Sequence, residues 1–145
     1  MGGSEIIGGF GEFLGGLLLR RGVCTMEAAK QFFACDSLSD PYQLKDMDKA
    51  AEIIRNALDE DKKITVFGDY DCDGVTSTVM LYSYLEAMGA DVDFYIPDRS
   101  EGYGMNIPAL TKILNGGTQL VITVDNGISA AAEADFIREH GAELV

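Results

Sequence analysis

The sequence has few of the residues that mark several common classes of protein. Its 145 residues include only three prolines, three cysteines and one histidine, and no tryptophan. Because 47% of the residues are hydrophobic and proline is scarce, a disordered polar tail is excluded. Cys24, Cys35 and Cys72 are odd in number and form no CxxC pair. This excludes a disulfide framework and a zinc knuckle, and it favours a reduced, cytoplasmic setting.

Long apolar runs and positive charge are also scarce. The longest uninterrupted stretch of apolar residues and glycine, residues 13–19, is far shorter than the roughly 20 residues that a transmembrane helix needs. We therefore expect no membrane span. The sequence has 24 acidic against 11 basic side chains and a net charge of −13. This balance argues against a broad nucleic-acid-binding face, because phosphate contacts need clustered Lys and Arg.

Two regions of different character follow each other along the chain. Residues 1–60 predict a helical lead-in, with short helices at about residues 17–22 and 26–34 and an amphipathic helix from about residue 46. Residues 61–145 instead alternate β-rich runs with helical stretches, which is typical of parallel βαβ units. The expected strands are 64–67, 92–96, 120–124 and the start of a fourth at 143–145. We expect an α/β fold with a doubly wound, mainly parallel sheet, preceded by the helical segment.

Acidic residues follow the first expected strand directly. Asp69, Asp71 and Asp73 alternate with other residues, so an extended segment would point all three to one side. Carboxylates this close repel each other, and a hard divalent cation bound through oxygen ligands relieves the repulsion. The alternative is a solvated acidic loop. The start of the run also matches a calcium-binding EF-hand loop, but that loop needs a glutamate at its twelfth position, where this sequence has Met80.

The next two expected strands also end in groups suited to binding. Arg99 follows the second strand with a planar guanidinium suited to phosphate, and residues 102–104 (Gly-Tyr-Gly) let the backbone approach a ligand closely. Asp125 and Asn126 follow the third strand. Each feature alone is compatible with an ordinary turn. Because ligands bind beyond the carboxyl ends of the strands in doubly wound sheets, the three strand ends together predict one site.

These motifs resemble those of the DHH phosphoesterase superfamily, specifically its RecJ-type single-stranded-DNA-specific exonucleases. The matching segments are residues 66–76, 97–104 and 123–129 for the family's three motifs, and residues 18–22 and 40–48 for the RecJ-type lead-in. The resemblance implies a Rossmann-like DHH domain that is incomplete here, because the family's fourth strand leads into an Asp-His-His signature that this sequence does not contain. We therefore expect an N-terminal fragment that is inactive or nearly so by itself.

The resemblance also implies an activity and a set of site residues. The activity is hydrolysis of phosphodiester bonds, dependent on Mn²⁺ or Mg²⁺, by a 5′-to-3′ exonuclease that acts on single-stranded DNA in DNA repair and recombination. Asp71, Asp73 and Asp125 would be catalytic metal ligands, and Asp69 a ligand or a direct neighbour of the ligands. The residues that would bind substrate are Arg99, Gly102, Tyr103, Gly104 and Asn126.

Two other functions stay open from the sequence. A different DHH phosphoesterase would act on short oligonucleotides, cyclic dinucleotides or pyrophosphate, although the RecJ-type lead-in argues against it. A non-catalytic module would bind a divalent ion or a nucleotide as a sensor or partner-binding domain. The sequence identifies no protein partner.

Overall fold

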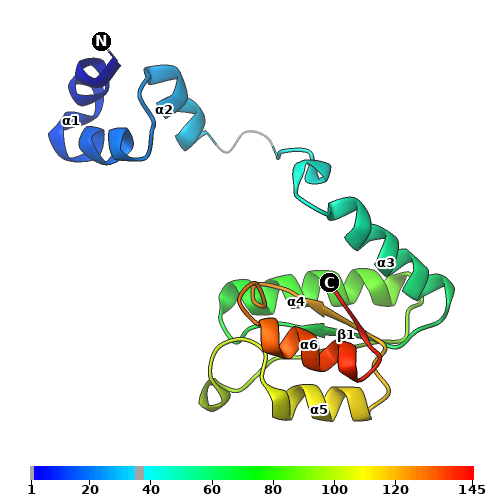
Figure 1. The fold of residues 1–145 in the computed structure, drawn as a ribbon. Helices are drawn as coiled ribbons and strands as arrows, with labels where there is room; N and C mark the ends of the chain where they lie inside the picture. The colour runs from blue at the N-terminus through cyan, green and yellow to red at the C-terminus, as the bar shows by residue number, and fades with distance from the viewer. Residues whose placement is uncertain (1, 35–37) are drawn as a thin grey trace. The chain divides into compact units, whose positions relative to one another are not determined.

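The computed structural model describes residues 2–34 and 38–145 (Figure 1). By its internal contacts the chain divides into two compact units, Met1–Gln43 and Leu44–Val145. The division expected from the sequence falls after residue 60, whereas the structure groups helix α3 (Met47–Asp59) with the sheet that follows it. The reason is burial, since Ala57 of α3 is fully buried in the same apolar cluster as Ile64 of the first strand.

The first unit consists of two helices, α1 (Gly2–Arg20) and α2 (Met26–Phe33). The helix expected at residues 17–22 is the end of the much longer α1, which bends at Gly11, where φ is 75°. The second helix was expected at this position, and Thr25 begins it by accepting a hydrogen bond from the Ala28 amide at 3.1 Å. The buried side chains that hold the two helices together are Ile6, Leu18, Val23 and Ala29.

The second unit is built on a four-stranded parallel sheet in the order β2-β1-β3-β4. The strands are β1 (Ile64–Phe67), β2 (Val92–Tyr95), β3 (Leu120–Thr123) and β4 (Glu143–Leu144). The longer helices between them are α4 (Cys72–Ala87), α5 (Ile107–Asn115) and α6 (Ala131–Glu139), and a short 3₁₀ turn, η2 (Arg99–Glu101), lies between β2 and α5. Another 3₁₀ turn, η1 (Pro41–Gln43), ends the first unit. This order confirms the doubly wound parallel sheet. It also places the reversal of strand order between β1 and β3, where such sheets bind ligands.

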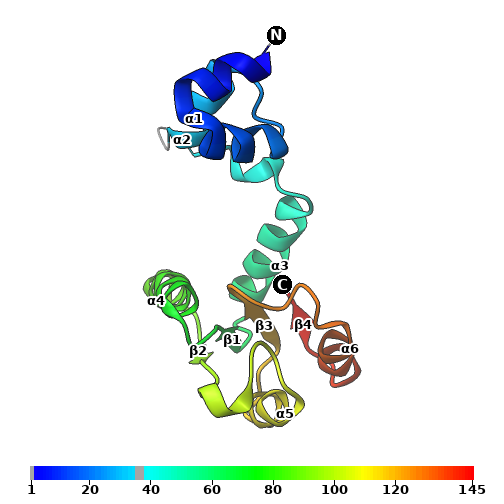
Figure 2. The ribbon, with the colours of Figure 1, turned by 90° about the vertical axis from the view of Figure 1, so that its left-hand side faces the viewer.

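Helices cover both faces of the sheet. Val66 packs on one face with Leu85 of α4 and with α3, whereas its neighbour Phe67 packs on the other with Leu110 of α5 and with Ile137 of α6. Figure 2 shows α5 and α6 on one side of the sheet and α3 and α4 on the other. Successive side chains of β1 therefore enter opposite cores, and all four residues of this central strand are buried.

Helix α4 begins earlier than expected, and this changes the geometry of the acidic run. The sequence placed its start at about residue 75, but the structure starts it at Cys72 with Asp71 as the N-cap. One Asp71 oxygen, Oδ1, accepts hydrogen bonds from the amides of Asp73 and Gly74, each at 3.0 Å. Asp73 therefore lies in the first helical turn, and the expectation that three aspartates share one side of an extended segment is wrong.

The structure also describes the length of the helices and the state of two cysteines. Within residues 2–34 and 38–145, no helix combines the length and the apolar character that crossing a bilayer requires. Cys24 and Cys72 are exposed free thiols, and Cys35 lies outside the described residues.

Candidate functional site

Three aspartates converge at the carboxyl ends of β1 and β3. Asp69 follows β1, Asp71 caps α4, and Asp125 follows β3. One carboxylate oxygen from each lies within 4.8 Å of the others. They occupy the point where strand order reverses, which is the position at which the sequence predicted a site.

Asp69 is the buried member of this aspartate cluster. It is 1% exposed, and within the described part of the chain its Oδ1 has no hydrogen-bond partner. Two glycines allow α4 to pack this closely against the turn. A Cβ at Gly74 would lie 2.5 Å from the Asp69 carbonyl oxygen, and one at Gly68 would lie 2.0 Å from Thr78 Oγ1. A buried carboxylate oxygen without a partner is costly, so this position is suited to a ligand that supplies positive charge.

Asp125 reaches the aspartate cluster through an unusual backbone conformation. Its φ of 58° lies in the left-handed region, which non-glycine residues seldom adopt. The Tyr103 hydroxyl donates a hydrogen bond to the Asp125 carbonyl oxygen at 3.0 Å. The Asn126 amide nitrogen donates to the carbonyl oxygens of Phe67 at 3.2 Å and Val124 at 3.1 Å, which joins the ends of β1 and β3. These contacts fix the loop that carries Asp125.

The electrostatics of the aspartate cluster favour a bound cation. Loss of surrounding water and the negative charges of Asp71 and Asp73 raise the pKa of Asp125 above its ordinary value. Among the described residues, no lysine, arginine or histidine forms an ion pair with any of these carboxylates. A divalent cation such as Mn²⁺ or Mg²⁺, which prefers oxygen ligands, therefore fits the donor set.

Asp73 occupies a different position from the other three predicted metal ligands. It is exposed in the first turn of α4, and it is not one of the residues whose oxygens converge within 4.8 Å. Its charge nevertheless acts on Asp125. The structure thus brings Asp69, Asp71 and Asp125 together and leaves Asp73 beside them.

The second motif lies next to both acidic loops. The Arg99 guanidinium carbon is 4.7 Å from the centre of the Tyr70 ring, beside Asp69 and Asp71 in sequence, and Tyr103 contacts the Asp125 loop. The flanking Gly102 and Gly104 have φ values of 92° and 81°. All four predicted substrate-binding residues of this motif therefore belong to one loop that borders the aspartate cluster. The fifth, Asn126, donates hydrogen bonds from its side-chain amide nitrogen to backbone carbonyl oxygens of the protein.

Sequence reasoning missed one residue that organises this loop. Glu101 accepts hydrogen bonds from the Asp98 amide at 2.7 Å, the Tyr95 hydroxyl at 2.8 Å and the Asn106 side chain at 3.3 Å. Asp98 and Glu101 form a capping box around η2, and hydrogen bonding lowers the pKa of both carboxyls. The spacing Asp-x-x-Glu is the signal that could have revealed it.

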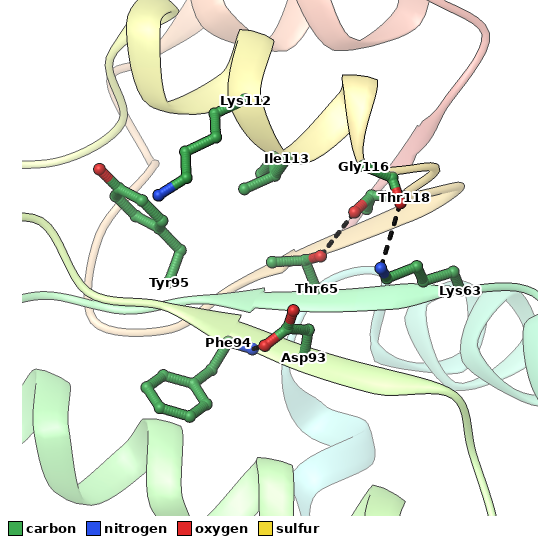
Figure 3. Close-up of a pocket in the computed structure, with 9 residues that line it drawn as sticks. All are labelled: Lys63, Thr65, Asp93, Phe94, Tyr95, Lys112, Ile113, Gly116 and Thr118. Atoms are coloured by element: carbon green, nitrogen blue, oxygen red, sulfur yellow. Dashed lines mark hydrogen bonds between the residues drawn. The ribbon is translucent and has the colours of Figure 1, made fainter.

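A separate hollow of about 390 Å³ lies between β2, β1 and α5 (Figure 3). None of the three residues of the aspartate cluster lines it. Its polar groups are largely committed to the fold. Lys63 donates to the Gly116 carbonyl oxygen at the end of α5 at 3.1 Å, and the hydroxyls of Thr65 and Thr118 are hydrogen-bonded at 2.7 Å. Lys112 lies 5.7 Å from the Tyr95 ring. These contacts stabilise the end of α5, so the hollow is a weaker candidate than the aspartate cluster.

Comparison with known proteins shows which family the chain resembles. Residues 63–145 match the model of the DHH family, N-terminal domain. The chain belongs to the DHH family. The Bacillus subtilis protein named single-stranded-DNA-specific exonuclease RecJ is 44% identical to this DHH chain over 132 residues, which cover 89% of the chain and 17% of the relative. The protein of the same name from Thermus thermophilus is 42% identical over 103 residues, covering 70% and 15%. The chain thus spans about a sixth of the length of these relatives.

Solved structures match this DHH chain as well. Exonuclease RecJ bound to manganese superimposes with a TM-score of 0.65 at 42% identity, covering 70% of this chain and 26% of that one. RecJ from Thermus thermophilus in complex with Mn²⁺ gives a TM-score of 0.64 at 33% identity, covering 88% and 17%. These similarities confirm the predicted family resemblance and the α/β fold. The roles of the individual site residues stay predictions.

Proposed function

We propose that this DHH chain supplies the aspartate cluster of a metal-dependent 5′-to-3′ exonuclease, which hydrolyses phosphodiester bonds of single-stranded DNA in DNA repair and recombination. The observation that carries the proposal is the convergence of Asp69, Asp71 and Asp125, with a buried Asp69 oxygen that has no partner in the described structure. The names of the relatives support single-stranded DNA as substrate. We also propose a cytoplasmic location, because these relatives are bacterial proteins and the chromosomal DNA of bacteria lies in the cytoplasm.

The aspartate cluster would hold Mn²⁺ or Mg²⁺. Asp69, Asp71 and Asp125 supply the oxygens, and Asp73 adds negative charge beside them. A divalent cation at this position supplies Lewis-acid chemistry, because it neutralises phosphate charge and lowers the pKa of water. The N-terminal amides of α4 hold Oδ1 of Asp71, which fixes the direction of its carboxylate before a cation binds.

The loop of the second motif would meet the DNA strand. Arg99 is exposed, and no carboxylate of the described chain forms an ion pair with it, so its guanidinium can bind a phosphate. Tyr103 is 66% exposed, and its ring offers a surface for stacking a base. Gly102 and Gly104 carry no side chains that would block the approach of a strand.

Metal binding by the chain is the first test. Isothermal titration with Mn²⁺ should show binding to the unsubstituted chain and none to Asp69→Asn, because that change removes the buried ligand charge. Asp91→Asn is the matched control, since Asp91 is an exposed aspartate at the amino end of β2 and its substitution removes the same charge. Equal binding by Asp69→Asn would contradict the proposed metal centre.

Activity can be tested in a chimera. Residues 63–145 would replace the corresponding segment of Bacillus subtilis RecJ, and degradation of labelled single-stranded DNA would be followed with Mn²⁺. We expect the chimera to degrade the substrate and its Asp71→Asn version to lose activity, while the Asp91→Asn version stays active. An Asp71→Asn chimera as active as its parent would refute the catalytic assignment.

A further inference from the structure

The Asp125 carbonyl oxygen accepts a hydrogen bond from Tyr103, a residue of the second motif. We propose that Tyr103 is a positioning residue for Asp125, whose left-handed backbone its hydroxyl stabilises so that the Asp125 carboxylate faces Asp69 and Asp71. This inference rests on the proposed metal centre. It assigns the Tyr103 hydroxyl a role within the protein that differs from the substrate contact predicted from the sequence.

The conformation of Asp125 needs outside support. Three described non-glycine residues have positive φ, namely Asp46, Asp61 and Asp125. The first is the N-cap of α3 and the second follows the end of α3, so both belong to the ends of a helix. Asp125 instead lies two residues after the end of β3, and no such helix end accompanies it. A left-handed residue at this position persists when the surrounding structure holds it.

The support available to Asp125 is specific. Within residues 2–34 and 38–145, the Tyr103 hydroxyl, at 3.0 Å, is the donor found for the Asp125 carbonyl oxygen. Asn126 ties the next residue of the loop to Phe67 and Val124, but neither of its side-chain hydrogen bonds is made to the Asp125 carbonyl oxygen. Loss of the left-handed conformation at Asp125 would turn its side chain away from the direction in which it meets the other two aspartates. Tyr103 therefore positions Asp125, the proposed metal ligand that follows β3.

The loop that carries Tyr103 is anchored by hydrogen bonds at its start. Glu101 ties the start of its loop to Tyr95 of β2 and to Asn106, the N-cap of α5. The loop then reverses through Gly102 and Gly104, whose φ values of 92° and 81° are readily available to glycine. The second motif is thereby connected through Tyr103 to the third. This connection explains how a mostly exposed tyrosine can hold a fixed position.

Tyr103→Phe tests the proposal because it removes only the hydroxyl. We expect the dissociation constant for Mn²⁺ to rise about tenfold, the lower end of what loss of a ligand's supporting hydrogen bond causes, with an unchanged melting temperature. Tyr84→Phe is the matched control, since Tyr84 is similarly exposed, lies on α4 and should bind Mn²⁺ as the unsubstituted chain does. Unchanged affinity in Tyr103→Phe would overturn the proposal, and so would a fall in affinity that merely tracks a fall in melting temperature.

A metal-free measurement separates this inference from the proposed metal centre. In the unsubstituted chain, a strong nuclear Overhauser effect between the amide and α protons of Asp125 should report its left-handed φ. We expect it to weaken in Tyr103→Phe and to persist in Tyr84→Phe. If the unsubstituted chain binds no Mn²⁺, the metal centre is refuted, and this signal still decides the positioning. A signal that persists in Tyr103→Phe overturns the role of Tyr103.

Discussion

The charged side chains at the two ends of the central strand β1 are arranged differently. At the amino end, Lys62 lies 2.9 Å from a carboxylate oxygen of Glu60 and 3.1 Å from one of Glu143, so opposite charges are paired. At the carboxyl end, Asp69 and its two acidic neighbours converge, and no ion pair compensates them within the described residues. The charges of the first arrangement are compensated within the protein, whereas those of the second have no compensating ion pair among the described residues.

This difference distinguishes charged residues that are paired within the fold from charged residues that are kept unpaired for function. Exposed ion pairs such as those of Lys62 add little to stability and need nothing from outside the chain. Unpaired like charges at a partly buried position destabilise the fold, and proteins keep them mainly where function requires them. The glycines, the capping hydrogen bonds and the left-handed Asp125 all serve the carboxyl end. The predictions below perturb one end or the other.

The largest effect is expected from Gly74→Ala, at the carboxyl end. Its Cβ would lie 2.5 Å from the Asp69 carbonyl oxygen, so α4 must move away from the turn. We expect a loss of about 3 kcal/mol in the free energy of unfolding, measured by urea denaturation, together with weaker Mn²⁺ binding. Gly16→Ala is the matched control, because Gly16 is also helical and a Cβ there meets nothing within 4 Å. That change should stabilise its helix by about 0.5 kcal/mol. Equal stabilities of the two variants would contradict the close packing at Gly74.

A pH dependence of intermediate size is expected from Asp125. Because its pKa is raised in the folded state, the folded metal-free chain binds this proton more tightly than the unfolded chain. The resulting stability is present below the ordinary aspartate pKa and is lost as pH rises through the raised pKa. The difference in melting temperature between Asp125→Asn and the unsubstituted chain should therefore grow across this interval in favour of the variant. A difference that is constant with pH would show that Asp125 is not perturbed.

The smallest effect is expected at the amino end of the strand. Lys62→Met removes both ion pairs but leaves the aspartate cluster untouched. Because such pairs are exposed to solvent and screened by salt, the melting temperature should fall by only about 1–2 °C, and less at high salt. Mn²⁺ affinity should stay within about twofold, since the change is at the opposite end of the strand. A large loss of Mn²⁺ affinity would contradict the separation between the two ends.

Much of the fold could be predicted from the sequence because its signals are local. The buried runs that became β1 and β3 are almost wholly apolar, and Asn106 with the following proline correctly predicted the start of α5. Helix α1 was predicted too short, since its glycine-rich first part has weak helical propensity. Burial of Ile6 and Leu18 in the first unit supports the longer helix.

The candidate site was predicted less completely. Asp69, Asp71 and Asp125 were identified as a group because they follow strands, and the structure brings them together. Asp73 was placed wrongly on the same side, because the N-cap role of Asp71 starts the helix before it. Glu101 was missed because its three hydrogen-bond donors come from positions before and after it in the loop and the flanking elements.

The sequence by itself determined the alternation of strands and helices and the presence of acidic groups after β1 and β3. Both follow from apolar patterning and from spacing, which act over a few residues. Only the tertiary structure decided which carboxylates meet. That choice depends on the order of strands in the sheet, on the close approach of α4 at Gly74, and on a hydrogen bond from Tyr103 to Asp125. The order of the strands and the hydrogen bond from Tyr103 join residues that are distant in the chain, so no local pattern encodes them.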